Sequence, residues 1–330
     1  MSATELLVVE NLSVTFDSEQ GPARAVRGVS FAVRAGETLA VVGESGCGKS
    51  VSARAILRLH DPATTQVSGR VLLEGRDLLA LPEREMREVR GSAISMIFQD
   101  PMTSLNPLMR VGDQVAEVFR VRKGMPREQA KAASLDLFTR VGIADPRRRF
   151  DQYPHEFSGG MLQRVMILIA AAAGPRLMVA DEPTTSLDVT VQAQILALID
   201  GLKSELGMSV LLITHDMGIV AEHASSIAVM YAGRIVETGP TAEVLAQPRH
   251  PYTEGLLEAI PRPGSRGGRL RTIESSPPGL FDTLAPCSFA PRCRYRAAEC
   301  DRETPPLLDR GTDRKAACAR CESLELKGAL

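Results

Sequence analysis

The chain has 330 residues, and 39 lysines and arginines stand against 40 aspartates and glutamates, which gives a formal net charge of −1. This length predicts one large domain with an additional part. The near-neutral charge excludes a general attraction to nucleic acid or to anionic membranes. The N-terminus lacks a secretion signal, and the longest apolar tract, Val165 to Gly174, is too short to cross a bilayer as a helix. We therefore expect a cytosolic chain without a membrane span.

Short β segments bounded by glycines occupy the first part of the chain. The pattern predicts strands at Leu6–Phe16, Val26–Val33 and Arg70–Leu73, followed along the chain by further buried strands and by helices. The later apolar strands are expected at residues 177–180, 210–214 and 227–230, and helices are expected at residues 49–59 and 191–205. Strands that alternate with helices in this way predict a mostly parallel α/β sheet.

Two other stretches depart from this alternation. Between about Asp100 and Ala172 no strand pattern occurs, and helix-length segments such as Arg127–Val141 predict a helical insert. From about Pro261 onward proline and glycine recur, as in Pro261–Gly264, which predicts a separate C-terminal tail.

A glycine-rich loop follows the apolar run Thr38–Val42. Its glycines let backbone amides turn around an anion, Lys49 adds a positive charge, and the Ser50 hydroxyl can bind magnesium. The loop also opens a helix, whose N-terminal amides favour an anion. We therefore expect a triphosphate-binding loop made of Gly43, Glu44, Ser45, Gly46, Cys47, Gly48, Lys49, Ser50 and Val51. Cys47 is either a small filler or an unusually acidic thiol, and we expect its alkylation to block nucleotide binding.

Two adjacent carboxylates, Asp181 and Glu182, end the apolar strand at residues 177–180. Ligands of open α/β sheets bind at this carboxyl edge. Asp181 would hold magnesium through water and Glu182 would polarise the attacking water, as phosphoryl transfer requires. The alternative is an exposed acidic turn.

The segment Phe157–Gln163 resembles the signature of ATP-binding cassette (ABC) ATPases, with Met161 where the family most often has glutamine. Ile97–Asp100 is similar to the family's glutamine loop, Thr214–Asp216 to its switch histidine, and Ser186–Asp188 to the segment after its carboxylates. The resemblance spans about Leu6 to Glu243. It implies a P-loop NTPase core with an antiparallel β subdomain and a helical subdomain.

The resemblance also implies roles for individual residues. Gln99 would touch magnesium and the attacking water, and His215 would contact the γ-phosphate, although a lone histidine is more often a satisfied core group. Phe16 would stack on adenine or else belong to the core. The signature residues Ser158, Gly159 and Gly160 would contact the nucleotide held by a second subunit, and Asp188 is also expected to bind nucleotide.

Two segments resemble the peptide-importer group of ABC ATPases, which serves oligopeptides, dipeptides and nickel. These are Met102–Pro107 and the stretch from Arg249 to Leu257, which begins the group's C-terminal extension. We therefore expect an ABC nucleotide-binding domain at residues 1–248, with its helical subdomain at about 100–172, and a C-terminal extension at 249–330.

Five of the six cysteines follow residue 286, which favours a metal over disulfides in a reducing compartment. Four thiolates suit either a zinc ion or an iron–sulfur cluster. Similar spacing in dipeptide-importer ATPases implies a [4Fe–4S] cluster on Cys287, Cys293, Cys300 and Cys318, with Cys321 as the alternative fourth ligand. A proline-rich tail has little core of its own, so a metal would stabilise it.

These features together predict the ATP-hydrolysing subunit of an importer for peptides or related solutes, peripheral on the cytoplasmic face of the membrane. Its cofactors would be ATP and Mg²⁺. The partners implied by the resemblance are two transmembrane permease subunits, a second and related ABC ATPase subunit, and indirectly an extracytoplasmic solute-binding protein. The rival interpretation is a soluble cassette ATPase that acts on nucleic acid or ribosomes; the near-neutral charge argues against it, and we expect no nucleic-acid partner.

Overall fold

The computed structural model describes residues 4–185, 187–260 and 273–329. By its internal contacts the chain divides into two compact units: unit 1 comprises residues 1–80 and 212–330, and unit 2 comprises residues 81–211. Within the described ranges, no helix combines the length and the apolar character needed to cross a membrane. The predicted boundary at residue 248 stays a prediction, because residues on both sides of it belong to unit 1.

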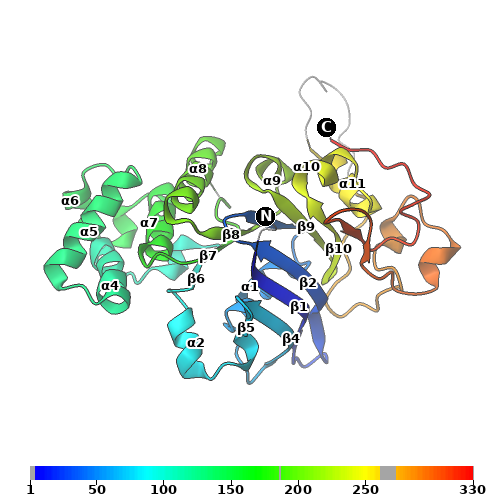
Figure 1. Ribbon diagram of the computed structural model, residues 1–330, viewed down its shortest axis with the longest axis horizontal. Coiled ribbons are helices and arrows are strands. Elements are labelled where there is room, and N and C mark those ends of the chain that lie inside the picture. The colour runs from blue at the N-terminus through cyan, green and yellow to red at the C-terminus, as the bar shows by residue number, and fades with distance from the viewer. Residues whose placement is uncertain (1–3, 186, 261–272, 330) are drawn as a thin grey trace. The chain divides into compact units, whose positions relative to one another are not determined.

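Unit 1 contains a four-stranded antiparallel sheet in the order β2-β1-β4-β5 (Figure 1). In β1 many buried residues alternate with partly exposed ones, because successive side chains of a strand point to opposite faces. Val14 lies opposite Val26 on one side and Val67 on the other. The predicted antiparallel subdomain is thereby confirmed. Its strands are β1 (Glu5–Phe16), β2 (Ala23–Arg34), β4 (Thr65–Leu73) and β5 (Arg76–Asp77).

The second sheet of unit 1 carries the glycine loop. In it β3 (Thr38–Val42) runs parallel to β9 (Ser226–Tyr231), and all five residues of β3 are buried. Burial of every residue is expected for a strand that is covered on both faces. Three antiparallel strands continue the sheet beyond β9: β10 (Arg234–Pro240), β12 (Lys315–Ala316) and β11 (Leu308–Asp309).

Two helices of unit 1, α9 (Met217–His223) and α11 (Pro251–Glu258), begin at side-chain caps. Asp216 accepts hydrogen bonds from the amides of Gly218 and Ile219 at the start of α9, and the His250 ring accepts one from the amide of Tyr252 at the start of α11. Such acceptors satisfy amides that have no partner inside the helix. The helices are α1 (Lys49–Ile56), α9 (Met217–His223), α10 (Thr241–Ala246) and α11 (Pro251–Glu258), with 3₁₀ turns η1 (Leu78–Ala80), η3 (Ala290–Arg292) and η4 (Ala298–Asp301).

Unit 2 combines two parallel strands with a group of helices, of which α4, α5, α6 and α7 gather together in Figure 1. No strand occurs between residues 100 and 172, all of which are described, so the predicted helical insert is confirmed. The strands are β6 (Ile94–Ile97) and β7 (Leu177–Asp181). The helices are α2 (Glu83–Val89), α3 (Pro101–Ser104), α4 (Val111–Lys123), α5 (Arg127–Arg140), α6 (Pro146–Phe150), α7 (Gly159–Ala172) and α8 (Val189–Leu206), with the 3₁₀ turn η2 (Pro154–Glu156). β8 (Ser209–Thr214) contains the boundary between the units.

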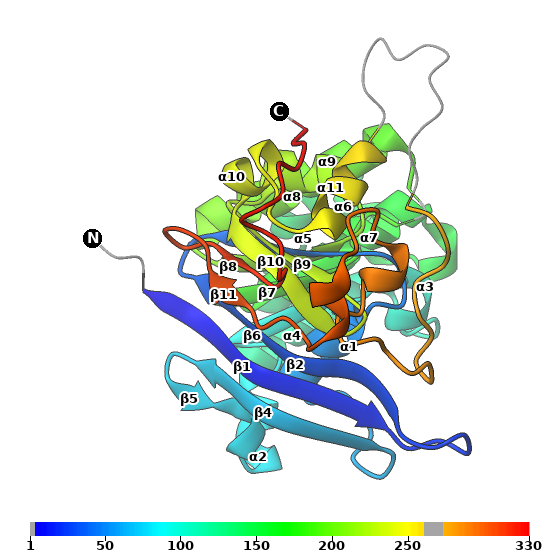
Figure 2. The same ribbon diagram turned by 90° about the vertical axis from the view of Figure 1, so that its right-hand side faces the viewer.

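The described part of the C-terminal extension is packed into unit 1, which corrects the expectation that it has little core. Phe289 is buried in one cluster with residues of β3, β9, α10 and α11, and its ring lies 5.2 Å from that of Tyr231 and 5.4 Å from that of Tyr252. Figure 2 shows the extension, in orange and red, beside β10 and α11. The predicted turn at Pro261–Gly264 lies outside the described residues.

Candidate active site

The glycine loop connects the end of β3 to the start of α1, as predicted. Two of its glycines have no room for a side chain: a Cβ on Gly43 would lie 2.1 Å from the carbonyl oxygen of Met230, and one on Gly48 would lie 2.6 Å from that of Ala25. Gly48 also has a φ of 107°, which L-residues rarely adopt. The neighbouring strands therefore enforce the tight backbone turn that an anion-binding loop needs.

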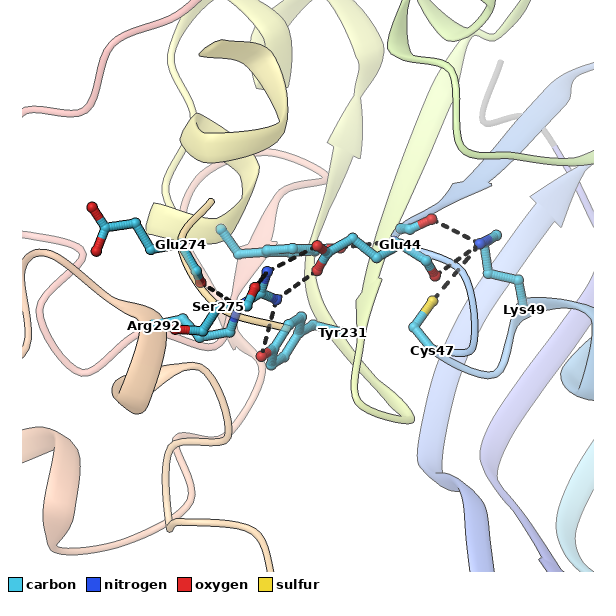
Figure 3. Close-up of polar contacts among 9 residues, drawn as sticks. Glu44, Cys47, Lys49, Tyr231, Glu274, Ser275 and Arg292 are labelled. Atoms are coloured by element: carbon cyan, nitrogen blue, oxygen red, sulfur yellow. Dashed lines mark hydrogen bonds and ion pairs between the residues drawn. The ribbon is translucent and has the colours of Figure 1, made fainter. Parts of the chain in front are cut away.

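Lys49 is buried inside this loop, with 4% of its surface exposed. Its Nζ donates to the carbonyl oxygens of Gly43 at 2.7 Å and of Glu44 at 3.1 Å (Figure 3). A buried ammonium needs such acceptors. In this arrangement two loop carbonyls bind the Lys49 ammonium group, which is predicted to bind phosphate.

Cys47 is buried, and its Sγ lies 3.9 Å from Lys49 Nζ. Burial raises the pKa of the Cys47 thiol, and the nearby Lys49 charge offsets this only in part. The interpretation of Cys47 as an unusually acidic thiol is therefore wrong, because desolvation outweighs the lysine. Its other interpretation, a small residue that fills the loop, agrees with the burial.

The carboxylates Asp181 and Glu182 lie at the end of β7 in unit 2. Asp181 is fully buried, whereas Glu182 is half-buried and has a φ of 48°, an unusual value for a residue other than glycine. The alternative of an exposed acidic turn does not describe a fully buried Asp181. Strained backbone of this kind is concentrated at functional sites.

Gln99 meets Glu182 because β6 and β7 are parallel and end at the same edge. Gln99 Nε2 donates to Glu182 Oε2 at 3.2 Å, and the Thr185 hydroxyl donates to the same oxygen at 2.9 Å. Two predicted residues from distant segments are thus brought together. Thr185 was missed, and its position three residues after Glu182 was the available signal.

His215 follows β8 and is exposed, so the interpretation as a buried core histidine is wrong. Phe16, at the end of β1, is half-buried, and its ring meets the His60 ring edge-on at 5.3 Å. Phe16 is therefore not a fully buried core residue, and a stacking role for it stays a prediction. The contact with His60 was not predicted from the sequence.

The signature residues lie at the start of α7, where Ser158 occupies the N-cap position and Gly159 and Gly160 form the first turn. A pocket of about 430 Å³ in unit 2 is lined by these three residues together with Leu187 and Asp188. The structure therefore places Asp188 beside the signature residues, and their shared role in binding nucleotide stays a prediction. Asp188 also caps α8 by accepting from the amide of Val191 at 2.9 Å. Ser186 lies outside the described residues.

The cysteines of the extension do not form a recognisable metal site. Cys287 and Cys293 are half-buried, Cys300, Cys318 and Cys321 are buried, and all are free. Among the described residues, no group of three or more histidine, cysteine, aspartate or glutamate side chains is arranged to hold a metal ion. Burial raises the pKa of Cys287 and Cys293, and raises that of Cys318 to about 12, so these thiols are held in the protonated form in this structure. The predicted iron–sulfur cluster, and zinc as its alternative, are therefore not supported.

Comparison with known proteins agrees with the fold and with the order of the motifs. The model of the ABC transporter family matches residues 26–185, and the model of the oligopeptide/dipeptide transporter C-terminal region matches residues 236–300. The chain is 48% identical to the dipeptide transport ATP-binding protein DppD of Bacillus subtilis over 315 residues, which covers 95% of this chain and 94% of the relative. It is 48% identical to the oligopeptide transport ATP-binding protein OppD of Salmonella typhimurium over 316 residues, which covers 96% and 94%.

A solved structure supports the same assignment. The dimeric ATP-binding cassette MJ0796 in a post-hydrolysis state, bound to ADP and Pi, has a TM-score of 0.63 and 26% identity, and the match covers 71% of this chain and 98% of that one. The chain therefore belongs to the ABC transporter family, as an ATP-hydrolysing subunit of the oligopeptide/dipeptide transporter type.

Proposed function

We propose that this subunit drives the import of peptides or related small solutes through separate permease subunits, at the cytoplasmic face of the membrane. The observation that carries the proposal is the pairing of an ABC transporter match at residues 26–185 with an oligopeptide/dipeptide transporter match at 236–300. The names of DppD and OppD, which describe dipeptide and oligopeptide transport, support the same solute class. No observation favours the rival, a soluble ATPase that acts on nucleic acid or ribosomes.

The glycine loop would hold the phosphates of ATP. Its backbone amides would surround the β-phosphate, while Lys49 would exchange its two carbonyl acceptors for phosphate oxygens. The steric exclusion of a Cβ at Gly43 and Gly48 fits this role, because side chains there would fill the loop.

The hydroxyl of Ser50, the amide of Gln99 and the carboxylate of Asp181 are oxygen donors of the kind that Mg²⁺ prefers. Bound there, Mg²⁺ would neutralise charge on the phosphates. Glu182 would accept a proton from the attacking water, and its contacts with Gln99 and Thr185 hold its carboxylate in one orientation. His215 would contact the γ-phosphate, and Phe16 would stack on adenine.

The signature pocket of Ser158, Gly159, Gly160 and Asp188 would bind the nucleotide of a second, related ABC ATPase subunit. ATP would then join two cassettes, and its hydrolysis would let them separate. Moving such an equilibrium from 1:99 to 99:1 requires about 5.5 kcal/mol of differential affinity. Closure would be passed to the permease subunits, which receive solute from an extracytoplasmic binding protein.

The cysteine cluster is a separate proposal. An iron–sulfur cluster, or zinc in its place, on Cys287, Cys293, Cys300 and Cys318, with Cys321 as the alternative fourth ligand, is supported by the spacing of these cysteines in the sequence. Against it, the described part of the chain contains no group of three or more potential metal ligands arranged to hold an ion. Iron, sulfide and zinc contents of protein purified without air decide the matter, and a colourless protein free of these metals removes the proposal.

The transport proposal is tested by co-purification and reconstitution. The chain is expressed together with permease subunits of the oligopeptide/dipeptide importer type. The complex is placed in vesicles with ATP on the cytoplasmic side and a peptide-binding protein on the other. We expect ATP-dependent uptake of labelled di- or oligopeptides, and none with ADP. Recovery of the chain with ribosomes instead of permease, or a complex that hydrolyses ATP without moving peptide, would contradict the proposal.

A further inference from the structure

The side chain of Glu44, the second residue of the glycine loop, is held by an arginine from the C-terminal extension. Arg292 Nη1 donates to Glu44 Oε2 at 2.6 Å, and Arg292 Nη2 donates to Glu44 Oε1 at 2.9 Å (Figure 3). The side chain of Arg292 is 4% exposed and that of Glu44 is 27% exposed. Two parallel hydrogen bonds between a guanidinium and a carboxylate are stronger than bonds between neutral groups, and they fix the orientation of both side chains.

Arg292 is itself fixed on several sides. It ends the 3₁₀ turn η3, its Nε donates to the carbonyl of Glu274 at 3.0 Å, and its Nη2 donates to the carbonyl of Ser275 at 2.9 Å. Its guanidinium also lies 5.8 Å from the centre of the Tyr231 ring. These contacts hold the guanidinium in place, so the extension presents a pre-positioned positive group to the loop.

The backbone of Glu44 is held from two further directions. Its amide donates to the hydroxyl of Tyr252, a fully buried residue of α11, at 2.8 Å. Its carbonyl accepts from Lys49 Nζ at 3.1 Å. Glu44 therefore contacts two parts of the extension, Arg292 and α11, as well as the lysine that would bind the phosphates.

The negative charge of Glu44 determines what Arg292 contributes to nucleotide binding. A carboxylate within a loop that binds a triphosphate repels its ligand, and this repulsion is strong where solvent screening is weak. Arg292 neutralises the negative charge of Glu44 and holds its carboxylate in one rotamer. We propose that Arg292 is a positioning residue for nucleotide binding: it neutralises Glu44, so that the affinity of the loop for ATP depends on the C-terminal extension. The inference rests on the proposed role of Gly43–Ser50 in binding phosphate.

The test measures ATP affinity by titration calorimetry on the full chain. We expect R292Q to weaken ATP binding about tenfold, equivalent to about 1.4 kcal/mol. The double variant R292Q/E44Q is expected to regain most of this loss, because no uncompensated carboxylate remains. R292K keeps the positive charge but cannot form the two parallel hydrogen bonds of the guanidinium, and its ATP affinity is expected to fall by no more than about threefold. Arg296 provides the matched control, since it pairs with Asp301 at 3.0 Å on the exposed side of the extension, and R296Q should bind ATP as the wild type does.

Salt dependence separates neutralisation from a purely structural effect. Repulsion is screened by ions, so the loss caused by R292Q should be larger at 50 mM than at 500 mM salt. An unchanged affinity in R292Q, a double variant no better than R292Q, or a loss independent of salt would each overturn the inference. Wild-type protein that binds no ATP would instead refute the proposed phosphate loop, and circular dichroism of each variant shows whether it has folded.

Discussion

His250 makes the stability of unit 1 depend on pH below neutrality. Its side chain is 2% exposed, and its Nδ1 accepts a hydrogen bond from the amide of Tyr252 at 3.0 Å. Burial lowers the pKa of His250 to about 3. Protonation would place an uncompensated charge in the core and would remove the acceptor that caps α11. The folded protein therefore holds this imidazole neutral.

The sign and size of the effect follow from linkage. An unfolded histidine has a pKa of about 6.5, so between that pH and the folded pKa the unfolded chain binds the extra proton. The stability contributed by His250 is therefore present above about pH 6.5 and is lost as the pH falls towards 3. At about 1.36 kcal/mol per pKa unit, lowering the pH from 7.5 to 5.5 removes about 1.4 kcal/mol.

Urea unfolding of H250N and wild type at both pH values measures this loss. Asparagine can cap α11 with its side-chain oxygen but does not titrate. We expect H250N to be less stable at pH 7.5, because it leaves space beside Phe289, and to lose about 1.4 kcal/mol less than wild type on acidification. H155N is the control, since His155 is an exposed histidine of unit 2. Equal pH dependence of H250N and wild type would refute the reasoning.

Three further changes test other parts of the structure. E182Q is expected to bind ATP normally but to hydrolyse it about 10²–10⁴-fold more slowly, as phosphate release will show; full turnover would mean that Glu182 is not the base. R314M leaves the fully buried Glu237 without its ion-pair partner at 3.0 Å and should cost about 3–5 kcal/mol in urea unfolding, whereas a loss below about 1 kcal/mol would contradict the burial of that pair. Iodoacetamide should modify Cys47 far more slowly in the folded than in the unfolded chain, because the thiol is buried and its pKa is raised. Complete modification should abolish ATP binding, as measured by titration.

The loop and the carboxylates were predictable because their signals are local. The glycine spacing from Gly43 to Ser50 follows one apolar run, and Asp181 and Glu182 follow another. Each pattern by itself predicts functional residues at the end of a strand, without information from the rest of the chain. These are short-range patterns that need no tertiary information.

The contact between Gln99 and Glu182 is different: no strand was expected at Ile94–Ile97, and only the family resemblance placed Gln99 near the attacking water. The structure supplies the reason for the contact, since β6 and β7 are parallel neighbours that end at one edge.

The contacts of the extension could not be predicted in this way. Glu44 and Arg292 are separated by 248 positions, and no periodicity links a loop residue to an arginine in a turn. β10 was missed for a related reason. Its central Glu237 is fully buried, which a strand pattern penalises, and its acceptors are satisfied by the amides of Arg249 and His250 and by Arg314. The cysteines of the extension give a similar case. Their spacing indicates which residues could bind a metal, but it does not show whether their side chains point toward one another.

The stability of the extension comes from packing and buried polar contacts. Phe289 completes an aromatic cluster with Tyr231 and Tyr252, and the fully buried Glu254 accepts from Arg294 at 2.8 Å and from the amide of Lys327 at 2.8 Å. Since Tyr252 also binds the amide of Glu44, the residues that stabilise the extension are the ones that shape the phosphate loop. Loss of the extension would therefore uncover the core of unit 1 and alter the loop in the same event, because both depend on the same buried side chains.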